Sequence, residues 1–380
     1  MANNNENKIL NVPNLRFPEF SGKWKKCTLG DITINFNLRN KEKIELPMYS
    51  VTNNRGFIPQ SEQFEDRDMV GEDIKAYKII HNKDFAYNPA RINVGSIAKY
   101  NGSKPCMISS LYVCFKAANG IDEDWLMHLL RSPKIQYYYN INGEGGVRIY
   151  LFYPNFARIR TSFPTIAEQR KIANLLSLLD ARITTQNKII EDLKKLKSAI
   201  YQNLFFHLQG DKVPLSELAE IIKGQQINGS ELSENGKYYV MNGGITPSGY
   251  YDNYNTEADT ISISEGGNSC GYVQYNSSDF WSGGHCYTLR IKPTALISTP
   301  FLFHFLKWKE PDIMALRSGS GLPNIQKKDL SKVCIIVPTL DEQQQLIALL
   351  STFQMKIENE EIFTSNLNKQ KQHLLSQMFI

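Results

Sequence analysis

The chain of 380 residues has 43 Lys and Arg against 38 Asp and Glu, a formal net charge of +5, and 42% of its residues are hydrophobic. This composition is typical of a water-soluble globular protein long enough for more than one domain. No apolar run reaches the roughly 18 residues of a membrane span and the N-terminal stretch MANNNENKIL is polar, so we predict neither a span nor a signal peptide and expect a cytoplasmic protein.

The cysteines are spread along the chain. No Cys-x-x-Cys pair and no His-Glu-x-x-His motif occurs in the sequence, and this spacing predicts no metal site. We expect reduced thiols that lie mostly in the core. They are Cys27, Cys106, Cys114, Cys270, Cys286 and Cys334.

A long internal repeat organises the sequence. The stretch FPTIAEQRKIANLLSLLDARI starts at Phe163, and VPTLDEQQQLIALLSTFQMKI starts at Val337, an offset of 174 positions. A period of this length indicates two domain-sized units in tandem rather than a solenoid. We therefore predict a first globular domain with its N-terminal segment (1–163), a helix (164–208), a second globular domain (209–337) and a final helix (338–380).

The two globular blocks share fainter similarities. DFAYNPARINVGSIAKYNGS, from Asp84, can be laid over DTISISEGGNSCGYVQYNSS, from Asp259, and WLMHLLRS, from Trp125, over FLFHFLKW, from Phe301. Each pair predicts alternating strands joined by a Gly/Asn-rich turn and followed by a short apolar helix. The blocks vary while the helices are repeated closely, so we expect the helices to have a fixed role.

Apolar residues in both predicted helices recur at alternating spacings of three and four, the a/d pattern of a coiled coil. Polar residues interrupt the pattern at matching positions, Gln186 with Glu360 and Lys197 with Lys371, and such residues fix register. The predicted seam residues are Leu176, Leu179, Ile183, Ile190, Leu193, Lys197 and Ile200 in the first helix and Leu350, Phe353, Ile357, Leu367, Lys371 and Leu374 in the second.

Charge favours pairing of the two helices with each other. Residues 166–208 hold 7 basic and 4 acidic groups, whereas 339–380 hold 3 and 5. A seam of roughly 28 residues, about 42 Å at ~1.5 Å per residue, would suit DNA half-sites ~34–36 Å apart. The alternative is that each helix is a core helix of its own domain.

The repeated helices, with PNLRFPEFSGKWKKCTLGDI near the start and SGSGLPNIQKKDLSKVCIIVP before the second helix, closely resemble the specificity subunit of type I restriction-modification systems. The resemblance extends from Pro13 to Phe379. It implies an α+β fold in which two mixed α/β target recognition domains, in tandem pseudo-repeat, are separated by two long helices that pair as an antiparallel coiled coil.

The resemblance also implies a function. Each recognition domain would read one half of a bipartite double-stranded DNA target, and the helices would set the spacer. Two copies of a modification subunit, which carries the methyltransferase chemistry, would dock on the helices, and restriction (translocase and nuclease) subunits would join that assembly. DNA methylation and phage defence would follow.

We predict no catalytic, cofactor-binding or metal-binding residue in this chain. The sequence NPAR at Asn88 lacks the second proline and the aromatic residue of the Asn-Pro-Pro-aromatic loop of amino-methyltransferases. GEGGVR and SGSGLP match neither the dinucleotide fingerprint nor the P-loop. S-adenosylmethionine, ATP and Mg²⁺ are expected only on partner subunits. Two alternatives stay open: a stand-alone methyltransferase or nuclease, and a coiled-coil scaffold without a DNA role.

Cations and amides in loops are the candidates for DNA contact, because they can reach phosphates and base edges. In the first domain they are Asn53, Arg55, Asn88, Arg91, Asn93, Ser96, Lys99, Lys104 and Arg148. In the second domain they are Asn242, Asn268, Tyr272, Gln274, Arg317, Ser318, Ser320, Asn324, Lys327 and Lys328.

The charge of the two domains differs. Residues 1–165 hold 22 basic and 16 acidic groups, whereas 209–338 hold 11 and 13. The second domain is therefore not a strongly basic DNA-binding module, and we expect tight binding to need phosphate contacts from the modification subunits.

Overall fold

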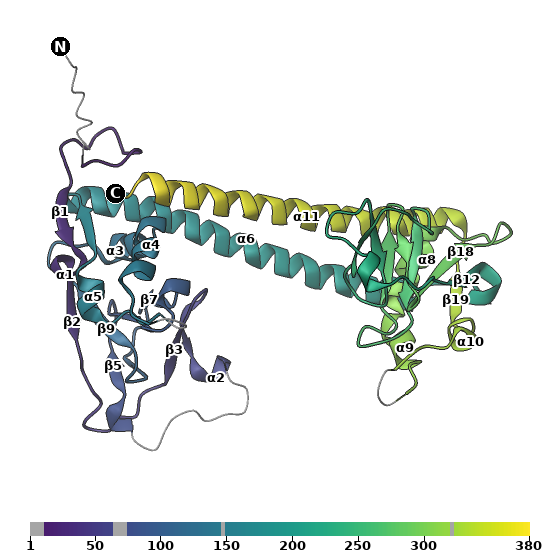
Figure 1. Cartoon of the computed structure of the whole chain (residues 1–380), viewed down its shortest axis with the longest axis horizontal. Coiled ribbons are helices and arrows are strands. Elements are labelled where there is room, and N and C mark those ends of the chain that lie inside the picture. Colours follow the sequence, from purple (N-terminus) through teal and green to yellow (C-terminus); the bar gives the residue numbers. More distant parts are fainter. Residues whose placement is uncertain (1–10, 64–73, 146–148, 320–322) are drawn as a thin grey trace, which may run out of the picture. The chain divides into compact units, whose positions relative to one another are not determined.

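The computed structural model describes residues 11–63, 74–145, 149–319 and 323–380 (Figure 1). The chain divides into two compact units. Unit 1 comprises the residues up to Asn187 together with Ile362–Ile380, and unit 2 comprises Lys188–Glu361. The long helices α6 (Ile166–Phe206) and α11 (Leu340–Gln377) therefore each contribute one part to each unit. Within the described residues, no helix is both long and apolar enough to cross a membrane.

Unit 1 is a mixed α/β domain. Its strands are β1 (Lys25–Thr28), β2 (Thr33–Phe36), β3 (Tyr49–Thr52), β4 (Gly56–Pro59), β5 (Lys78–Ile80), β6 (Phe85–Tyr87), β7 (Ile97–Lys99), β8 (Cys106–Ile108), β9 (Val113–Ala117) and β10 (Arg160–Phe163). Its shorter helices are α1 (Leu29–Ile32), α2 (Gln60–Gln63), η1 (Ile74–Ala76), η2 (Ile92–Val94), α3 (Glu123–Leu130), α4 (Pro133–Asn142) and α5 (Tyr153–Ala157).

Unit 2 is also a mixed α/β domain. Its strands are β11 (Asp211–Pro214), β12 (Ala219–Lys223), β13 (Tyr238–Met241), β14 (Gly249–Tyr251), β15 (Thr260–Ser264), β16 (Val273–Asn276), β17 (Trp281–Ser282), β18 (Cys286–Ile291) and β19 (Cys334–Val337). Its shorter helices are α7 (Leu215–Leu218), η3 (Gly229–Glu231), α8 (Thr299–Trp308), α9 (Glu310–Ala315) and α10 (Lys327–Leu330).

The two units share the topology of their four-stranded sheet, whereas their remaining sheets differ: β3-β4 and β5-β8 in unit 1, and β14-β13-β17 in unit 2. Unit 1 has an antiparallel four-stranded sheet in the order β2-β9-β6-β7, and unit 2 has one in the order β12-β18-β15-β16. A separate antiparallel pair, β1 with β10 or β11 with β19, precedes each long helix. The predicted duplication and the α+β fold class are therefore confirmed.

Strand register corrects one detail of the sequence comparison. Phe85 pairs with Phe115 and Tyr87 with Val113, while Ile261 pairs with Leu289 and Ile263 with Tyr287. The strands β9 and β18 have the same place in the two sheets, and Phe115 of β9 corresponds to Leu289 of β18. Their partners therefore correspond as well: Phe85 to Ile261 and Tyr87 to Ile263, an offset of 176. Laying Asp84 over Asp259 gives 175 and is wrong by one residue, a slip that exchanges the two faces of a strand.

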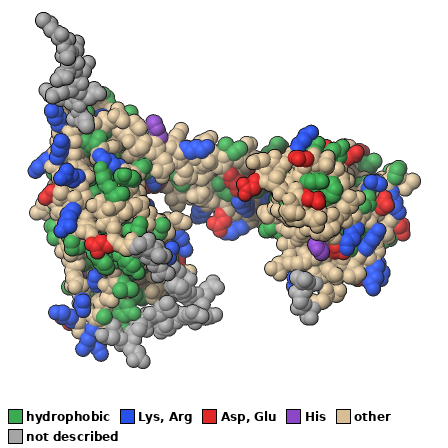
Figure 2. Space-filling view, in the orientation of Figure 1, with side chains coloured by type: hydrophobic (Ala, Val, Ile, Leu, Met, Phe, Trp, Pro, Cys, Tyr) green, Lys and Arg blue, Asp and Glu red, His purple; other side chains and the backbone are tan. Residues whose placement is uncertain are grey.

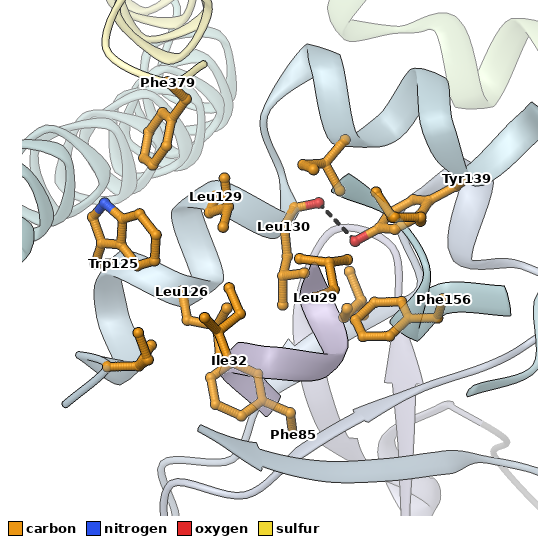
Figure 3. Close-up of a cluster of buried hydrophobic side chains, with 14 of the residues drawn as sticks. Leu29, Ile32, Phe85, Trp125, Leu126, Leu129, Leu130, Tyr139, Phe156 and Phe379 are labelled. Carbon is orange, nitrogen blue, oxygen red and sulfur yellow. Dashed lines mark hydrogen bonds between the residues drawn. The ribbon is translucent and has the colours of Figure 1, made fainter. Parts of the chain in front are cut away.

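Each unit buries an aromatic-rich core. In unit 1, α3 places Trp125, Leu126, Leu129 and Leu130 against α1, β6 and α5 (Figure 3). The ring of Trp125 lies 6.0 Å, centroid to centroid, from Phe379 at the end of α11. In unit 2, the side chains of α8 pack against the α6 residue Phe205 and the α11 residue Leu350. Four of the six cysteines are buried, as predicted, and Cys334 is exposed.

The glutamine of the repeated P-x-x-x-E-Q motif makes the same contacts in both units. Gln169 is fully buried, and its Oε1 accepts a hydrogen bond of 2.8 Å from the Asp122 backbone N–H. Its Nε2 donates to the carbonyls of Gly120, at 3.3 Å, and Pro164, at 2.9 Å. The motif thus joins the start of the long helix to the turn that precedes α3.

In unit 2, the fully buried Gln343 accepts from the Ser298 backbone N–H at 2.9 Å and donates to the carbonyls of Leu296 and Pro338 at 2.9 and 3.0 Å. These contacts connect α11 to the start of α8. Because a buried amide must satisfy both its donor and its acceptor, each glutamine fixes its helix against its own domain.

The glutamate of the motif differs between the units. Glu168 is buried and accepts from Arg16, at 2.7 and 2.8 Å, and from the Trp24 indole at 3.2 Å, which anchors the N-terminal segment. Glu342 is exposed and accepts from Thr339 at the start of α11. One position of the repeat is therefore used in two ways.

The two long helices pair antiparallel within each unit, as predicted. In unit 1, Lys371 forms an ion pair with Asp180. In unit 2, Lys197 donates to Gln354 at 2.6 Å, and Lys194 pairs with Glu361 at 2.6 Å. The predicted seam residues are all buried or partly buried. Both seam lysines therefore hydrogen-bond across to the other helix, a contact that is specific to this register.

Two neighbouring leucines of α11 differ in burial, because one lies in the seam and the other does not. Leu350 is 1% exposed, whereas Leu349 is 42% exposed on the same helix. Leu350→Ala should lower the free energy of unfolding by about 2–5 kcal/mol because it opens a cavity, and Leu349→Ala should change it by less than about 0.5 kcal/mol. Urea denaturation of both variants measures this, and equal losses would contradict the assigned helix face.

A histidine stands at the equivalent position of α3 and α8. His128 Nε2 lies 3.2 Å from the Ser177 hydroxyl, and His304 bonds to the Tyr201 hydroxyl. Burial lowers the pKa of each histidine to about 4. Both imidazoles are therefore neutral in the folded protein at neutral pH.

These depressed pKa values predict the pH dependence of stability. The folded state binds fewer protons than the unfolded state, whose histidines titrate near pH ~6.5, so the free energy of unfolding should fall as the pH drops from about 6.5 towards about 4. His128→Gln should flatten this dependence, and the exposed His207→Gln should not. Urea unfolding across this pH range measures the free energy of unfolding. The same pH dependence in both variants would refute the depressed pKa of His128.

Candidate nucleic-acid interface

Two loops of unit 1 bring together four of the predicted DNA-contacting residues. Asn53 and Arg55 lie in the β3–β4 turn, and Asn88 and Arg91 follow β6. All four line one cavity of about 490 Å³. Residues 35 positions apart in the sequence therefore form one polar surface.

The two loops are fixed locally. The Thr52 hydroxyl accepts from the Arg55 backbone N–H at 3.1 Å and donates to the Gly56 carbonyl at 3.1 Å, which closes the turn. Asn88 Oδ1 accepts from the Ala90 N–H at 3.0 Å. The Arg55 guanidinium pairs with Glu62 at 2.8 Å, but both side chains are more than half exposed, so a phosphate could replace this weak partner.

A second cavity of about 490 Å³ in unit 1 is lined by Arg55, Lys99 and Arg131, together with acidic Asp124 and Asp180. Lys99 is mostly buried and forms an ion pair with Asp124. The cavity is therefore charged, with both signs present.

Four loops meet on one surface of unit 2. Residues 242–244 follow β13, 265–268 follow β15, 283–285 precede β18, and the described residues 318–319 and 323–324 precede α10. The Asn242 side chain accepts from the His285 backbone N–H at 3.1 Å. Isolated β-bridges join Asn324 to both Gly266 and Ser318. We call these four segments, as far as they are described, the loop cluster of unit 2.

Glycines allow the loops to approach this closely. A Cβ on Gly283 would lie 2.6 Å from Asn242 Oδ1, and one on Gly284 would lie 2.5 Å from Gln226 Oε1. Asn242 therefore leaves no room for a side chain at Gly283, whereas a side chain at Gly284 would displace the end of the Gln226 side chain.

Sequence comparisons show which known proteins this chain is similar to. Residues 210–367 match the family described as type I restriction modification DNA specificity domain. A curated relative from Mycoplasma pneumoniae, named as a type I specificity subunit, is 36% identical over 149 residues, which are 39% of this chain and 40% of the relative. A relative with the same description from Mycoplasma genitalium is 33% identical over 149 residues, 39% of each chain.

The match also extends over the whole chain. A Methanocaldococcus jannaschii protein named as a type I restriction enzyme specificity subunit is 23% identical over 407 aligned positions, which cover 93% of this chain and 95% of that one. The chain spans about two fifths of the length of the first two relatives, 40% and 39%.

Solved structures have the same fold as this chain. The crystal structure of a type I restriction-modification S subunit from M. genitalium aligns with a TM-score of 0.63 at 18% identity, over 97% of this chain and 99% of that chain. A chain from a structure described as the basis of complex assembly and conformational transition of the type I system aligns with a TM-score of 0.64 at 18% identity, over 95% and 98%.

The structure relocates several of the predicted DNA-contacting residues. Ser96 is buried at 1% exposure and donates to the Val51 carbonyl at 2.8 Å, so it holds the two loops of unit 1 together and does not face solvent. The predicted DNA contact at Ser96 is therefore wrong. Asn93 donates to Asn140 on α4 at 3.2 Å. Lys104 is exposed in the β7–β8 loop and lines neither cavity.

In unit 2, Asn242, Asn268, Ser318 and Asn324 belong to the loop cluster, and exposed Arg317 precedes it. Lys327 and Lys328 are exposed on α10, which follows it. Tyr272 and Gln274 point elsewhere: the Tyr272 ring lies 4.0 Å from Lys307 Nζ, and the Gln274 amide donates to Asn276 at 3.4 Å. Arg148 and Ser320 lie outside the described residues.

Sequence reasoning missed His285 and Gln226. The run SGGHCY carried a signal, because two adjacent glycines before a polar residue mark a close backbone approach. Charge alone would not have located this surface. Figure 2 shows Lys and Arg on the visible face of each unit with Asp and Glu among them.

Two glycines of the loop cluster provide a matched test. Gly243 and Gly267 have φ angles of +81° and +80°, so alanine is strained at both. A Cβ at Gly243 would also lie 3.1 Å from the His285 Cβ and carbonyl oxygen. A Cβ at Gly267 would have no heavy atom of the described residues within 4 Å. Gly243→Ala should therefore lower the free energy of unfolding by about 1 kcal/mol more than Gly267→Ala. Denaturant titration measures the difference, and equal values would show that the loops do not pack as described.

Proposed function

We propose that this chain is the specificity subunit of a type I restriction-modification system and reads a bipartite double-stranded DNA target, with one half-site for each unit. The duplicated topology carries the proposal: two copies of one sheet arrangement present different loops. The family match to a DNA specificity domain over residues 210–367 supports a DNA-reading role for unit 2.

The residues around each site suit this role. Arg55 and Arg91 in unit 1 can pair with phosphates or with guanine, and Asn88 can form a bidentate contact with adenine. In unit 2, Asn268 and Asn324 supply amides, and Arg317, Lys327 and Lys328 supply exposed cations beside them. Amides and cations in adjacent loops allow base reading and phosphate binding at one surface.

We further propose that the chain is non-catalytic and acts within a cytoplasmic complex. Two modification subunits would dock on the paired helices and supply the methyltransferase chemistry with S-adenosylmethionine, and restriction subunits would supply ATP- and Mg²⁺-dependent chemistry. The relative that forms part of a described type I assembly supports this arrangement. The acidic balance of residues 209–338, 13 acidic groups against 11 basic, agrees with phosphate contacts contributed by partners.

Mapping of methylated bases tests the proposal. The full chain is co-expressed with the modification subunit of its own system, and modified adenines are located across the genome by long-read sequencing. We expect two short specified halves separated by a fixed unspecified spacer. Arg91→Ala should relax one half only, by about 1–3 kcal/mol of discrimination at the affected base pair.

The control is Lys134→Ala, which removes a positive charge from an exposed position of α4 in the same unit. It should leave both halves as in the wild type. A continuous motif would contradict the assignment of one half-site to each unit. A stable complex that methylates nothing would favour a scaffold without a DNA role.

A further inference from the structure

A buried carboxylate stands at the centre of the loop cluster of unit 2. Glu265 follows β15 directly and is 7% exposed. Its Oε1 accepts from Lys223 Nζ at 2.8 Å and from the Tyr287 hydroxyl at 2.9 Å. Burial, as the main cause, and the hydrogen bond to Glu265, as the second, raise the pKa of Tyr287 to about 12, so the hydroxyl remains a donor.

The second oxygen of this carboxylate is unsatisfied. Among the described residues, no donor lies within hydrogen-bond distance of Glu265 Oε2, although the atom is buried. A buried charged oxygen without a donor lowers stability compared with an apolar side chain of the same shape. Stability of the core therefore does not account for a glutamate at this position.

The backbone of Glu265 joins two loops. Its N–H donates to the His285 carbonyl at 2.9 Å, and its carbonyl accepts from the Ile325 N–H at 2.8 Å. The preceding Ser264 hydroxyl donates to the Gly243 carbonyl at 2.7 Å. Residues 264 and 265 thus connect the three loops that carry Asn242, His285 and Asn324.

The side-chain contacts reinforce these links. Tyr287, which holds the carboxylate, also places its hydroxyl 3.2 Å from the Ile325 carbonyl. Lys223 reaches the carboxylate from β12, and 57% of its side chain is exposed. A single carboxylate therefore couples β12, β18 and the segment before α10.

Unit 1 has no carboxylate at the position that corresponds to Glu265. Tyr87 corresponds to Ile263 by strand register, so the residue that corresponds to Glu265 is Pro89. Any effect of Glu265 on DNA reading should therefore fall on one half-site.

We propose that Glu265 is a positioning residue for DNA recognition: it holds the loops that carry Asn242, Asn268 and Asn324 in the geometry that reads one half-site, and it does not touch DNA itself. The inference rests on the proposed function. It accounts for a partly satisfied carboxylate that the stability of unit 2 does not require.

The test uses Glu265→Gln and Tyr287→Phe in the full chain, co-expressed with the modification subunit. Glu265→Gln keeps the shape and removes the charge, and Tyr287→Phe keeps the ring and removes the donor. Each should lower discrimination about 5- to 10-fold at base pairs of the half-site that Arg91→Ala leaves intact, since a misplaced base contact costs about as much as a mismatch. The other half-site should stay near its wild-type discrimination.

Glu220→Gln is the matched control. Glu220 lies on β12 of the same sheet, is 59% exposed and pairs with Arg290 at 3.6 Å. The substitution removes an equal charge at a residue outside the loop cluster, so both half-sites should be unchanged.

The outcomes separate the two claims. If the wild type yields no bipartite motif, the proposed function fails. If the wild type yields one and both variants read it unchanged, or lose both halves equally together with stability, the positioning role of Glu265 is wrong and the proposed function stands.

Discussion

The structure depends on one repeated contact, the buried amide of Gln169 and of Gln343. Each glutamine satisfies a backbone N–H before a short apolar helix and two carbonyls, one of which belongs to the proline that opens its own motif. A buried amide that lost these partners would leave several polar groups unpaired, at about 1–3 kcal/mol each. Domain and long helix are therefore joined in the same way in both units, and the motif can tolerate little change.

This fixed connection separates two kinds of variation. The order of the four-stranded sheet and the pattern of the helix seam are the same in both units, whereas the loops at the ends of the strands differ. In unit 1 the surface is built from the β3–β4 turn and the segment after β6, which Ser96 ties together. In unit 2 it is built from four segments around Glu265. A frame that holds its own shape leaves loop sequences free to change specificity.

Much of the fold was predictable because it depends on periodicity. The seam residues could be read from spacings of three and four, and Lys197 and Lys371 could be recognised as its polar members. The duplication followed from a constant offset. The alignment of β6 in unit 1 with its counterpart β15 in unit 2 was not predictable. Side chains alternate between the two faces of a strand, and loops of different length shift the alignment by one residue.

The candidate site was predictable in part. Asn53, Arg55, Asn88 and Arg91 converge as a group because the β3–β4 turn lies beside the segment after β6, and the four residues line one cavity. Ser96 was misassigned, since burial of a serine depends on a distant carbonyl that sequence does not indicate. His285 and Glu265 were missed for the same reason: their roles come from contacts between loops, which only the tertiary structure supplies.

The central claim is that each unit reads its own half of one DNA target. Photo-crosslinking tests it most directly: duplexes carrying a photoreactive base in one half or the other are irradiated in the complex of the full chain with its modification subunit, and the attached peptides are identified by mass spectrometry. One half should label residues 49–60 and 88–96, and the other should label the loop cluster of unit 2. Labelling of the same unit from both halves would contradict it.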